Sequence, residues 1–197
     1  MLVKKEKKST GYISARESRK ISKENIKITR AYEKKRERKN VPESEYLTTM
    51  KNPENVVEFD NLHTYFFTDI GTVKAVDGVS FDVPIGKTVG IVGESGCGKS
   101  VTSMSLMQLV QRPTGQTVAG EMRLNLGDKA YDVAQMPLEA MQKIRGNEIA
   151  MIFQDPMTSL NPTFTVGEQI AAGYRLHENC TKAEAMKQAE EMLEMVG

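Results

Sequence analysis

Eight consecutive residues near the middle of the chain constrain its fold more than any other stretch. Residues 93–100, Gly-Glu-Ser-Gly-Cys-Gly-Lys-Ser, follow an apolar run at 89–92 and precede a helix-forming stretch at 101–107. The octet has the pattern G-x-x-x-x-G-K-[ST], which binds phosphate when a strand precedes it and a helix follows it. Glycine has no Cβ, so such a loop can take positive φ angles and turn its backbone N–H groups toward an anion. The sequence therefore predicts a phosphate-binding loop, or P-loop, where a buried strand leads into a helix.

Each position in this loop has a chemical role that follows from the pattern. Lys99 carries a point charge that can reach the β- and γ-phosphates of a nucleotide, and the Ser100 hydroxyl is placed to ligate Mg²⁺. The following helix directs its positive end at the same anion. We expect nucleotide contacts from Gly93, Ser95, Gly96, Cys97, Gly98, Lys99, Ser100 and Val101. A chance glycine-rich turn is the alternative, and the flanking strand and helix patterns argue against it.

Composition narrows the class of protein. The 197 residues contain no apolar run as long as a membrane span, and charged residues follow Met1-Leu2-Val3 where a signal peptide would have its apolar core. The two cysteines, Cys97 and Cys180, are too few for a disulfide framework, so we expect reduced thiols. These features predict a cytosolic protein that is free to dock onto a membrane-embedded partner.

Charge is divided unevenly along the chain. Residues 1–40 carry 15 Lys/Arg against 5 Glu, whereas residues 41–197 carry 12 Lys/Arg against 21 Asp/Glu. A capping box at Ser14–Glu17 predicts a charged helix through the thirties, but such a helix has few apolar residues to bury. We therefore expect residues 1–55 to form a basic extension that is disordered or a frayed helix. A solvated tail is the favoured reading, ahead of contact with anionic lipid headgroups and then with nucleic acid.

From residue 56 onward the pattern changes to short strands joined by turns, which indicates an antiparallel sheet. The expected strands of this kind are at 56–62, 64–67, 73–76, 79–83, 118–126 and 129–133. Two runs, Thr88–Val92 and Ile149–Phe153, are apolar on both faces, as buried parallel strands are. Helices are expected from the P-loop to about Leu109, at 137–145, at 166–176, and from a capping box at Thr181 onward.

Two strings together resemble a known family. Residues 90–100, which contain the P-loop, are followed about fifty residues later by Met-Ile-Phe-Gln-Asp-Pro-Met-Thr-Ser-Leu-Asn-Pro at 151–162. The pair resembles the ATP-binding subunits of ABC transporters, and more narrowly those of the dipeptide, oligopeptide and nickel importer group. The second string is the more selective marker, because P-loops occur in many NTPases. The likeness covers about Val56 to Gly197 and leaves the basic extension unexplained.

The resemblance implies roles for further residues. Phe66 matches the aromatic residue that stacks on adenine in the family, and Tyr65 is the second candidate for that role. The alternative is that Phe66 is a strand residue that only packs in the core. Gln154 matches the Q-loop glutamine, which in the family reaches Mg²⁺ and the attacking water. The alternative is that Gln154 is an ordinary loop residue without such a role. The resemblance thus implies that Lys99 and Gln154 are the catalytic residues, that Ser100 and Gln154 bind the metal, and that the cofactors are ATP and Mg²⁺.

The chain also departs from the family pattern. The signature loop, the Walker B carboxylates that end in Asp-Glu, and the switch histidine do not occur in this sequence, and we read His63 and His177 as surface residues. Cys97 replaces the commoner serine of the P-loop, which leaves the backbone contacts but makes the site a target for oxidation or alkylation. The resemblance therefore implies the front portion of a subunit, with little or no hydrolysis by the chain alone.

The expected fold is α/β: a partial P-loop NTPase core of ABC type with an antiparallel β-subdomain in residues 56–163, and the start of a helical subdomain in 164–197. With strands missing, the parallel sheet would have an open edge, so we expect poor solubility.

The expected function is that of an ATP-binding subunit of an importer for peptides, or for nickel and related solutes, on the cytoplasmic inner face of the cell membrane. Its implied partners are integral membrane permease subunits and a second ATP-binding subunit, and nucleic acid is not expected. Another P-loop NTPase is one alternative, although the guanine-reading Asn-Lys-x-Asp is absent. A non-enzymatic interaction protein with a basic membrane-surface arm and a remnant P-loop domain is the other.

Overall fold

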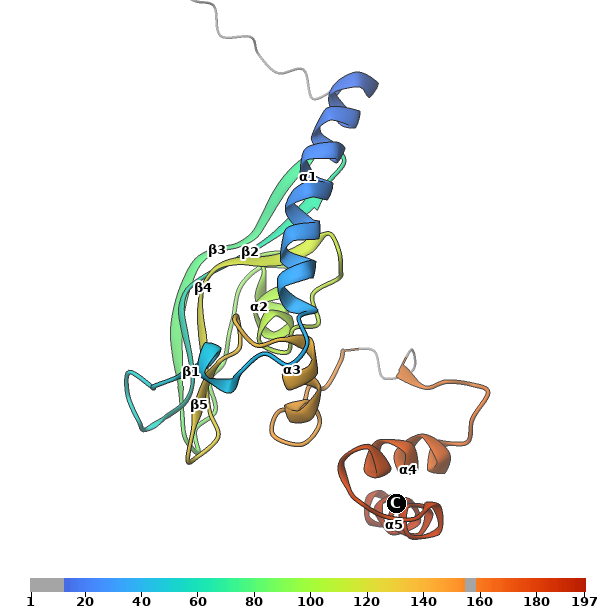
Figure 1. Ribbon diagram of the computed structural model, residues 1–197. Helices are drawn as coiled ribbons and strands as arrows, with labels where there is room; N and C mark the ends of the chain where they lie inside the picture. The colour runs from blue at the N-terminus through green and yellow to red at the C-terminus, as the bar shows by residue number, and fades with distance from the viewer. Residues whose placement is uncertain (1–12, 155–158) are drawn as a thin grey trace, which may run out of the picture. The chain divides into compact units, whose positions relative to one another are not determined.

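An antiparallel sheet of five strands is the frame of the first part of the chain (Figure 1). The computed structural model describes residues 13–154 and 159–197. The strand order is β1-β5-β4-β2-β3, and every neighbouring pair is antiparallel. The strands are β1 (Leu47–Thr48), β2 (Asn55–Thr68), β3 (Gly71–Pro84), β4 (Gly115–Asn125) and β5 (Ala130–Asp132). The expected antiparallel β-subdomain is thus confirmed, with the expected short strands between 56 and 83 merged into two long ones.

Apolar side chains of the central strands form the core of this sheet. Leu62 of β2 and Met122 of β4 are fully buried, and the rings of Phe59 and Phe81 stack with centroids 4.4 Å apart across β2 and β3. Burying a side chain of this size contributes about 1.5–3 kcal/mol. The long β2–β3 hairpin is therefore well anchored, and β3 is the edge strand from which the chain enters the P-loop.

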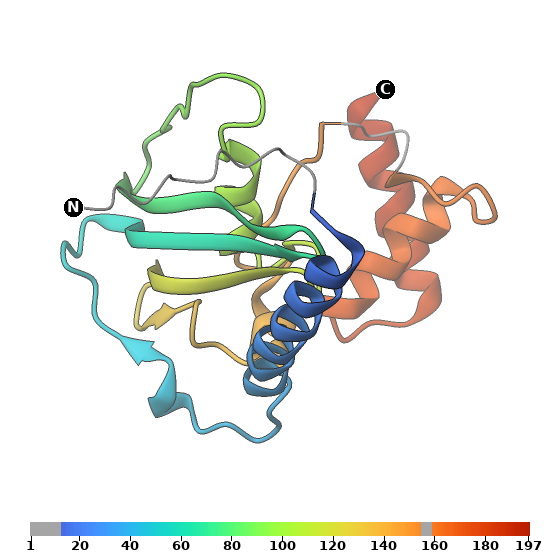
Figure 2. The same ribbon diagram turned by 90° about the horizontal axis from the view of Figure 1, so that it is seen from above.

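In the described part of the N-terminal extension, residues 15–36 form a helix that packs against this sheet, where a disordered or frayed arm was expected. Residues 1–12 of that expected arm lie outside the described residues. Helix α1 (Ala15–Arg36) begins at the expected capping box, in which the Ser14 and Glu17 side chains each bond the other residue's backbone N–H. It contacts β2 and β3, as Figure 2 shows, and it buries Asn25 and Thr29. The expectation failed because this helix docks through polar contacts, which a count of apolar residues does not reveal.

The chain separates into two compact units, Met1–Leu138 and Glu139–Gly197. This division differs from the expected boundaries after residues 55 and 163, since α1 belongs to the same unit as the sheet. In the first unit, a 3₁₀ turn (Glu43–Glu45) precedes β1, and α2 (Lys99–Leu106) follows the P-loop. Within the described residues, none of the helices combines the length and apolar character needed to cross a bilayer.

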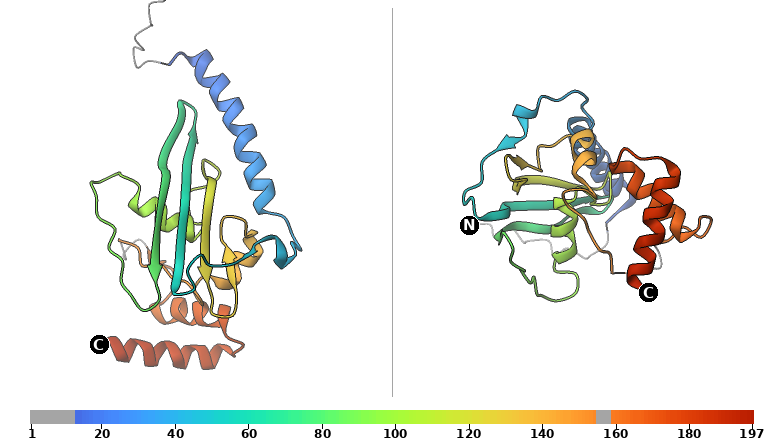
Figure 3. Two further views of the ribbon diagram at one scale, coloured as in Figure 1. Left: turned by 90° about the vertical axis from the view of Figure 1, so that its left-hand side faces the viewer. Right: turned by 90° about the horizontal axis from the view of Figure 1, so that it is seen from below.

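Two helices, α4 (Val166–His177) and α5 (Lys182–Val196), pair in the second unit (Figure 3). They meet through the buried alanines Ala171, Ala185 and Ala189, whose small side chains allow close packing. The expected capping box at Thr181 is confirmed, and Thr165 forms a second one with Glu168. The short helix α3 (Leu138–Ile144) matches the helix expected at 137–145.

The two expected parallel strands are not formed. Residues 88–92 form no strand, and 149–153 contribute only an isolated bridge between Arg145 and Ile149. Val92 is 93% exposed and Ile152 is 98% exposed. A strand that is apolar on both faces is stable only when neighbouring strands and helices cover it. The described residues supply no such neighbours to either segment, so the pattern was present without the structure that it predicts.

Candidate functional site

The P-loop turns sharply just before α2, and glycine makes the turn possible. Gly96 has a φ of +81° and Gly98 a φ of +95°, in the left-handed region that residues with a Cβ rarely adopt. Gly98 is also the N-cap of α2, and a Cβ there would lie only 2.3 Å from the Ala75 carbonyl oxygen of β3. Glycine at this position is therefore required twice, by the backbone angle and by the close approach of the loop to the sheet.

The ammonium of Lys99 is held over the mouth of the loop. Its Nζ donates hydrogen bonds to the carbonyl oxygens of Gly93 and Glu94, both at 2.7 Å, and lies 3.6 Å from the Cys97 Sγ. The side chain thus folds back on the loop from the first residue of α2. A positive charge beside the backbone N–H groups of a helix start, which have no partner within the helix, is an arrangement that favours an anion.

Buried hydroxyl groups fix α2 against the sheet. Ser105 and Thr64 of β2 share a hydrogen bond of 2.8 Å, and Ser105 also donates to the Val101 carbonyl oxygen at 2.7 Å. The exposed Ser100 and the partly buried Val101 lie in the first turn, at the end of the helix that faces the loop. Ser95 is exposed on the loop itself. The predicted phosphate-contacting residues are therefore gathered in one loop and one helical turn.

A cavity of about 480 Å³ adjoins this loop, lined by Gly98 and Lys99, by β3 from Ala75 to Asp77, and by the apolar segment 89–92. Asp77 accepts hydrogen bonds from the Tyr65 hydroxyl and the Lys74 ammonium, and it contacts the His63 ring. Tyr65, then His63 and Lys74, lower the pKa of Asp77 to about 2. Sequence reasoning missed this charged rim, because exposed charges on a strand carry no signal that distinguishes them from ordinary surface residues.

The two candidate adenine-stacking residues lie in different surroundings. Phe66 borders a depression shared with Asn25 and Thr29 of α1 and lies close to Gly115 of β4. Tyr65 bonds Asp77, which lines the cavity beside the P-loop. The structure therefore links the alternative aromatic residue, rather than Phe66, to the rim of the loop cavity.

Gln154 belongs to the second unit, in an exposed bend that follows Phe153. Residues 155–158 of the selective string lie outside the described residues. The two predicted metal ligands, Ser100 and Gln154, thus come from different units. Among residues 13–154 and 159–197, no group of three or more His, Cys, Asp and Glu side chains could hold a metal ion.

Comparisons with known proteins identify the family and the fold. The sequence pattern of the ABC transporter family matches residues 76–197. In structure, the chain is similar to the ATP-binding cassette MJ0796 in a dimeric post-hydrolysis state bound to ADP and Pi. That match has a TM-score of 0.59 at 23% identity and covers 71% of this chain and 56% of the other, so it shows the fold alone.

The curated relatives are ATP-binding proteins of peptide-type transport systems. The oligopeptide transport ATP-binding protein AppD of Bacillus subtilis is 49% identical over 142 residues, or 72% of this chain and 42% of AppD. A probable peptide ABC transporter ATP-binding protein, y4tR of Sinorhizobium fredii, is 44% identical over 72% of this chain and 41% of y4tR. The glutathione import ATP-binding protein GsiA of Shigella flexneri is 44% identical over 72% of this chain and 23% of GsiA. The chain spans less than half the length of these relatives, and it belongs to the ABC transporter family of ATP-binding proteins.

Proposed function

We propose that this chain is the nucleotide-binding part of an ATP-binding subunit that energises an importer for peptides or related solutes. The observation that carries the proposal is the position of the Lys99 ammonium at the mouth of a glycine loop, at the positive end of α2. The relatives named for oligopeptide, peptide and glutathione transport support the solute class, and nickel is the further solute of the group that the sequence resembles.

The residues of the loop fit a nucleotide phosphate. The free N–H groups at the start of α2 and the loop glycines would bind its oxygens, while Lys99 would exchange the Gly93 and Glu94 carbonyls for the phosphate. Ser100 would hold Mg²⁺ through its hydroxyl. Bound ATP supplies the phosphoanhydride whose hydrolysis drives transport, and this chain's residues position and neutralise it.

Gln154 would act as the second metal-directed side chain and as the sensor of the attacking water. The membrane permease subunits and a second ATP-binding subunit are the proposed partners, and they would place the protein on the inner face of the cell membrane. Because the Asp-Glu carboxylates, the signature loop and the switch histidine do not occur in this sequence, we expect weak or no ATP turnover from the chain alone. Steady turnover by the purified chain, at the rate of an intact transporter, would contradict this.

One aromatic residue would stack on the adenine, and two variants distinguish the candidates. Phe66→Ala should weaken ATP binding if Phe66 stacks on the adenine, as its position in the family pattern implies. Tyr65→Ala should weaken it if the adenine instead binds at the rim of the loop cavity. Stacking on a base is worth about 1–3 kcal/mol per base, or roughly fivefold to over a hundredfold in affinity. Equilibrium binding of a fluorescent ATP analogue to each variant measures the difference, and binding unchanged in both would remove the stacking proposal.

The central test is the removal of the Lys99 ammonium. Lys99→Ala should reduce the affinity for Mg-ATP by about tenfold to a hundredfold, because a hydrogen bond to a charged group is worth about 1.5–3 kcal/mol. Lys87→Ala is the matched control, since it removes an exposed lysine from the segment that leads into the loop. Equal affinity in the two variants would mean that the loop is not the phosphate site.

A further inference from the structure

Six basic side chains form one continuous stripe along α1. They follow each other at alternating spacings of four and three residues, which places them on a single face of the helix. The stripe consists of Arg16, Lys20, Lys23, Lys27, Arg30 and Lys34. All six are exposed, and none forms a salt bridge with another described residue. At about 1.5 Å per residue, the stripe is about 27 Å long.

The opposite side of α1 is fixed to the sheet, so the stripe has a defined outward orientation. Asn25 donates a hydrogen bond of 2.7 Å to the Thr68 carbonyl oxygen, and Thr29 is buried on the same side. These two residues lie on the helix face opposite the stripe, as their offset from Lys23 and Lys27 requires. The stripe therefore contributes nothing to holding the helix in place, and its charges are available to a partner.

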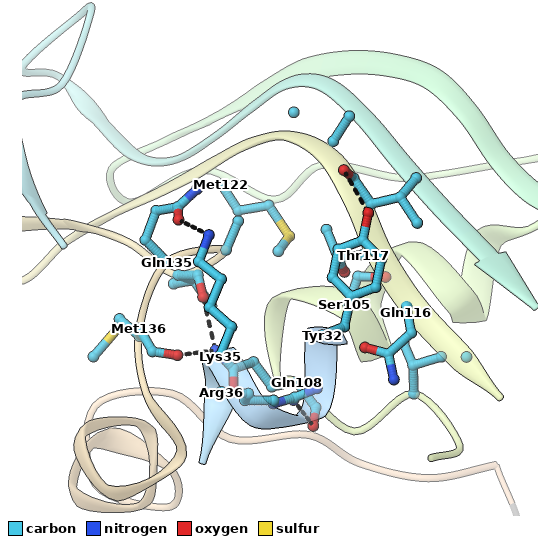
Figure 4. A pocket seen from close by; sticks show the side chains of 17 residues that line it. Tyr32, Lys35, Arg36, Ser105, Gln108, Gln116, Thr117, Met122, Gln135 and Met136 are labelled. Atoms are coloured by element: carbon cyan, nitrogen blue, oxygen red, sulfur yellow. Dashed lines mark hydrogen bonds between the residues drawn. The ribbon is translucent and has the colours of Figure 1, made fainter. Parts of the chain in front are cut away.

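The C-terminal end of α1 is anchored separately, across a small cavity of about 110 Å³ (Figure 4). Arg36 donates to the Gln108 carbonyl oxygen at 2.8 Å, and Lys35 donates to the Gln135 side chain at 2.7 Å. The basic residues that serve the fold are thus distinct from the six of the stripe. The helix is therefore held at its middle, through Asn25, and at its C-terminal end.

The acidic residues of α1 do not neutralise the stripe. Glu17 is occupied in the capping box with Ser14, and Glu33 accepts the Arg112 guanidinium on the docked side. This leaves Glu24 as the one remaining glutamate of α1. A helix that retains so many uncompensated cations on one face attracts an anionic surface.

We propose that the stripe docks α1 onto the surface of an anionic lipid bilayer. A straight row of cations on a fixed helix can reach a plane of headgroups with all its members at once, and basic residues near such a surface attract it electrostatically. The choice of a bilayer rests on the proposed function, in which the chain works beside a permease. The stripe carries no aromatic residue to stack on the bases of a single-stranded nucleic acid.

The test uses the full chain and two kinds of vesicle, phosphatidylglycerol mixed with phosphatidylcholine, and phosphatidylcholine alone. The chain should sediment with the first and not with the second, and added salt should weaken the binding. In the triple variant Lys20→Gln, Lys23→Gln, Lys27→Gln, the affinity should fall about a hundredfold, since each basic residue near the surface is worth roughly fivefold. Glutamine keeps a helix propensity close to that of lysine.

A matched control removes the same charge elsewhere. Lys39→Gln, Lys87→Gln, Lys143→Gln neutralises three exposed lysines outside α1 and should bind vesicles as the unmodified chain does. Equal losses in the two triple variants would overturn the proposal, because only net charge would then matter. Circular dichroism checks that both retain their helices, and substitution of the three stripe lysines by arginine should preserve binding even if the glutamine variant unfolds.

Two further outcomes decide the partner and separate this proposal from the proposed function. Tighter binding to duplex DNA than to the anionic vesicles, or no binding to those vesicles, would overturn the bilayer assignment. The Lys99→Ala variant should bind vesicles normally while losing ATP. A failure to bind ATP would therefore not contradict the bilayer proposal, and a failure to bind vesicles would not contradict the proposed nucleotide site.

Discussion

At the scale of single residues, Cys97 is the most unusual feature of the P-loop. Its thiol is exposed, and its sulfur lies 3.6 Å from the Lys99 ammonium that we expect to hold the phosphates. A bulky group on this sulfur would occupy the space into which Lys99 must turn. The backbone of the loop does not depend on the thiol, because Gly96 and Gly98 set its turn.

This arrangement predicts that alkylation of Cys97 blocks nucleotide binding. N-ethylmaleimide should abolish binding of a fluorescent ATP analogue, and excess Mg-ATP present during the reaction should slow the labelling. The Cys97→Ser variant should bind ATP within about twofold of the unmodified chain and should resist the reagent, since a hydroxyl conserves the size of the side chain. The Cys97→Ser variant still contains Cys180, which serves as the internal control. If N-ethylmaleimide still blocked ATP binding in this variant, the reactive thiol would not be Cys97.

At the scale of elements, the docking of α1 depends on a carboxylate. Glu33 accepts hydrogen bonds from the Arg112 guanidinium and from the Gln116 amide, and both partners lie outside the helix. Burial acts to raise the pKa of Glu33, but the bonds from Arg112 and Gln116 and the charge of Arg112 outweigh it, so this pKa lies below the ordinary value. A depressed carboxyl pKa stabilises the folded state above the unfolded pKa, and the contribution is lost as the pH falls through the folded pKa.

We therefore expect α1 to loosen on acidification and in the Glu33→Ala variant. The loosening should begin below about pH 4.3, the ordinary pKa of glutamate, and the variant should lose about 1–3 kcal/mol of the free energy of unfolding by leaving Arg112 without its partner. Amide hydrogen exchange of α1 measures the effect. Glu24→Ala, an exposed glutamate on the same helix, is the control, and equal protection in the two variants would rule out the ion pair as the anchor.

The elements that could be predicted from the sequence are those specified by neighbouring residues. Such elements depend on a few consecutive side chains, and the structure has the capping boxes at Ser14 and Thr181 and the glycine loop. The docking of α1 could not be predicted, because Asn25 and Glu33 find partners that are far along the chain and leave no periodic signal. The prediction of a strand at 88–92 was wrong for a related reason, because such a strand forms only when neighbouring strands and helices cover it.

At the scale of the whole molecule, exposed apolar segments leave the chain prone to association. Val92 and Ile152 are almost wholly exposed, and each lies in a run that is apolar on both faces. Unpaired segments of this kind offer backbone N–H and C=O groups together with apolar side chains to another chain.

We expect light scattering to show concentration-dependent self-association of the chain, and the Val92→Lys, Ile152→Lys double variant to suppress it, because charges oppose edge-to-edge pairing. Leu176→Lys, Met195→Lys is the control, since it charges two exposed apolar residues on α4 and α5 instead. A chain that stays monomeric at high concentration would contradict the prediction.

The anchorage of α1 has a mechanical consequence. Residues of α1 bond Gln108 and Arg112, which lie in the segment after α2, while the glycine loop precedes the other end of that eight-residue helix. Helix α1 and the glycine loop therefore contact segments at opposite ends of α2. We expect a surface that restrains α1 to affect the conformation of the P-loop through α2.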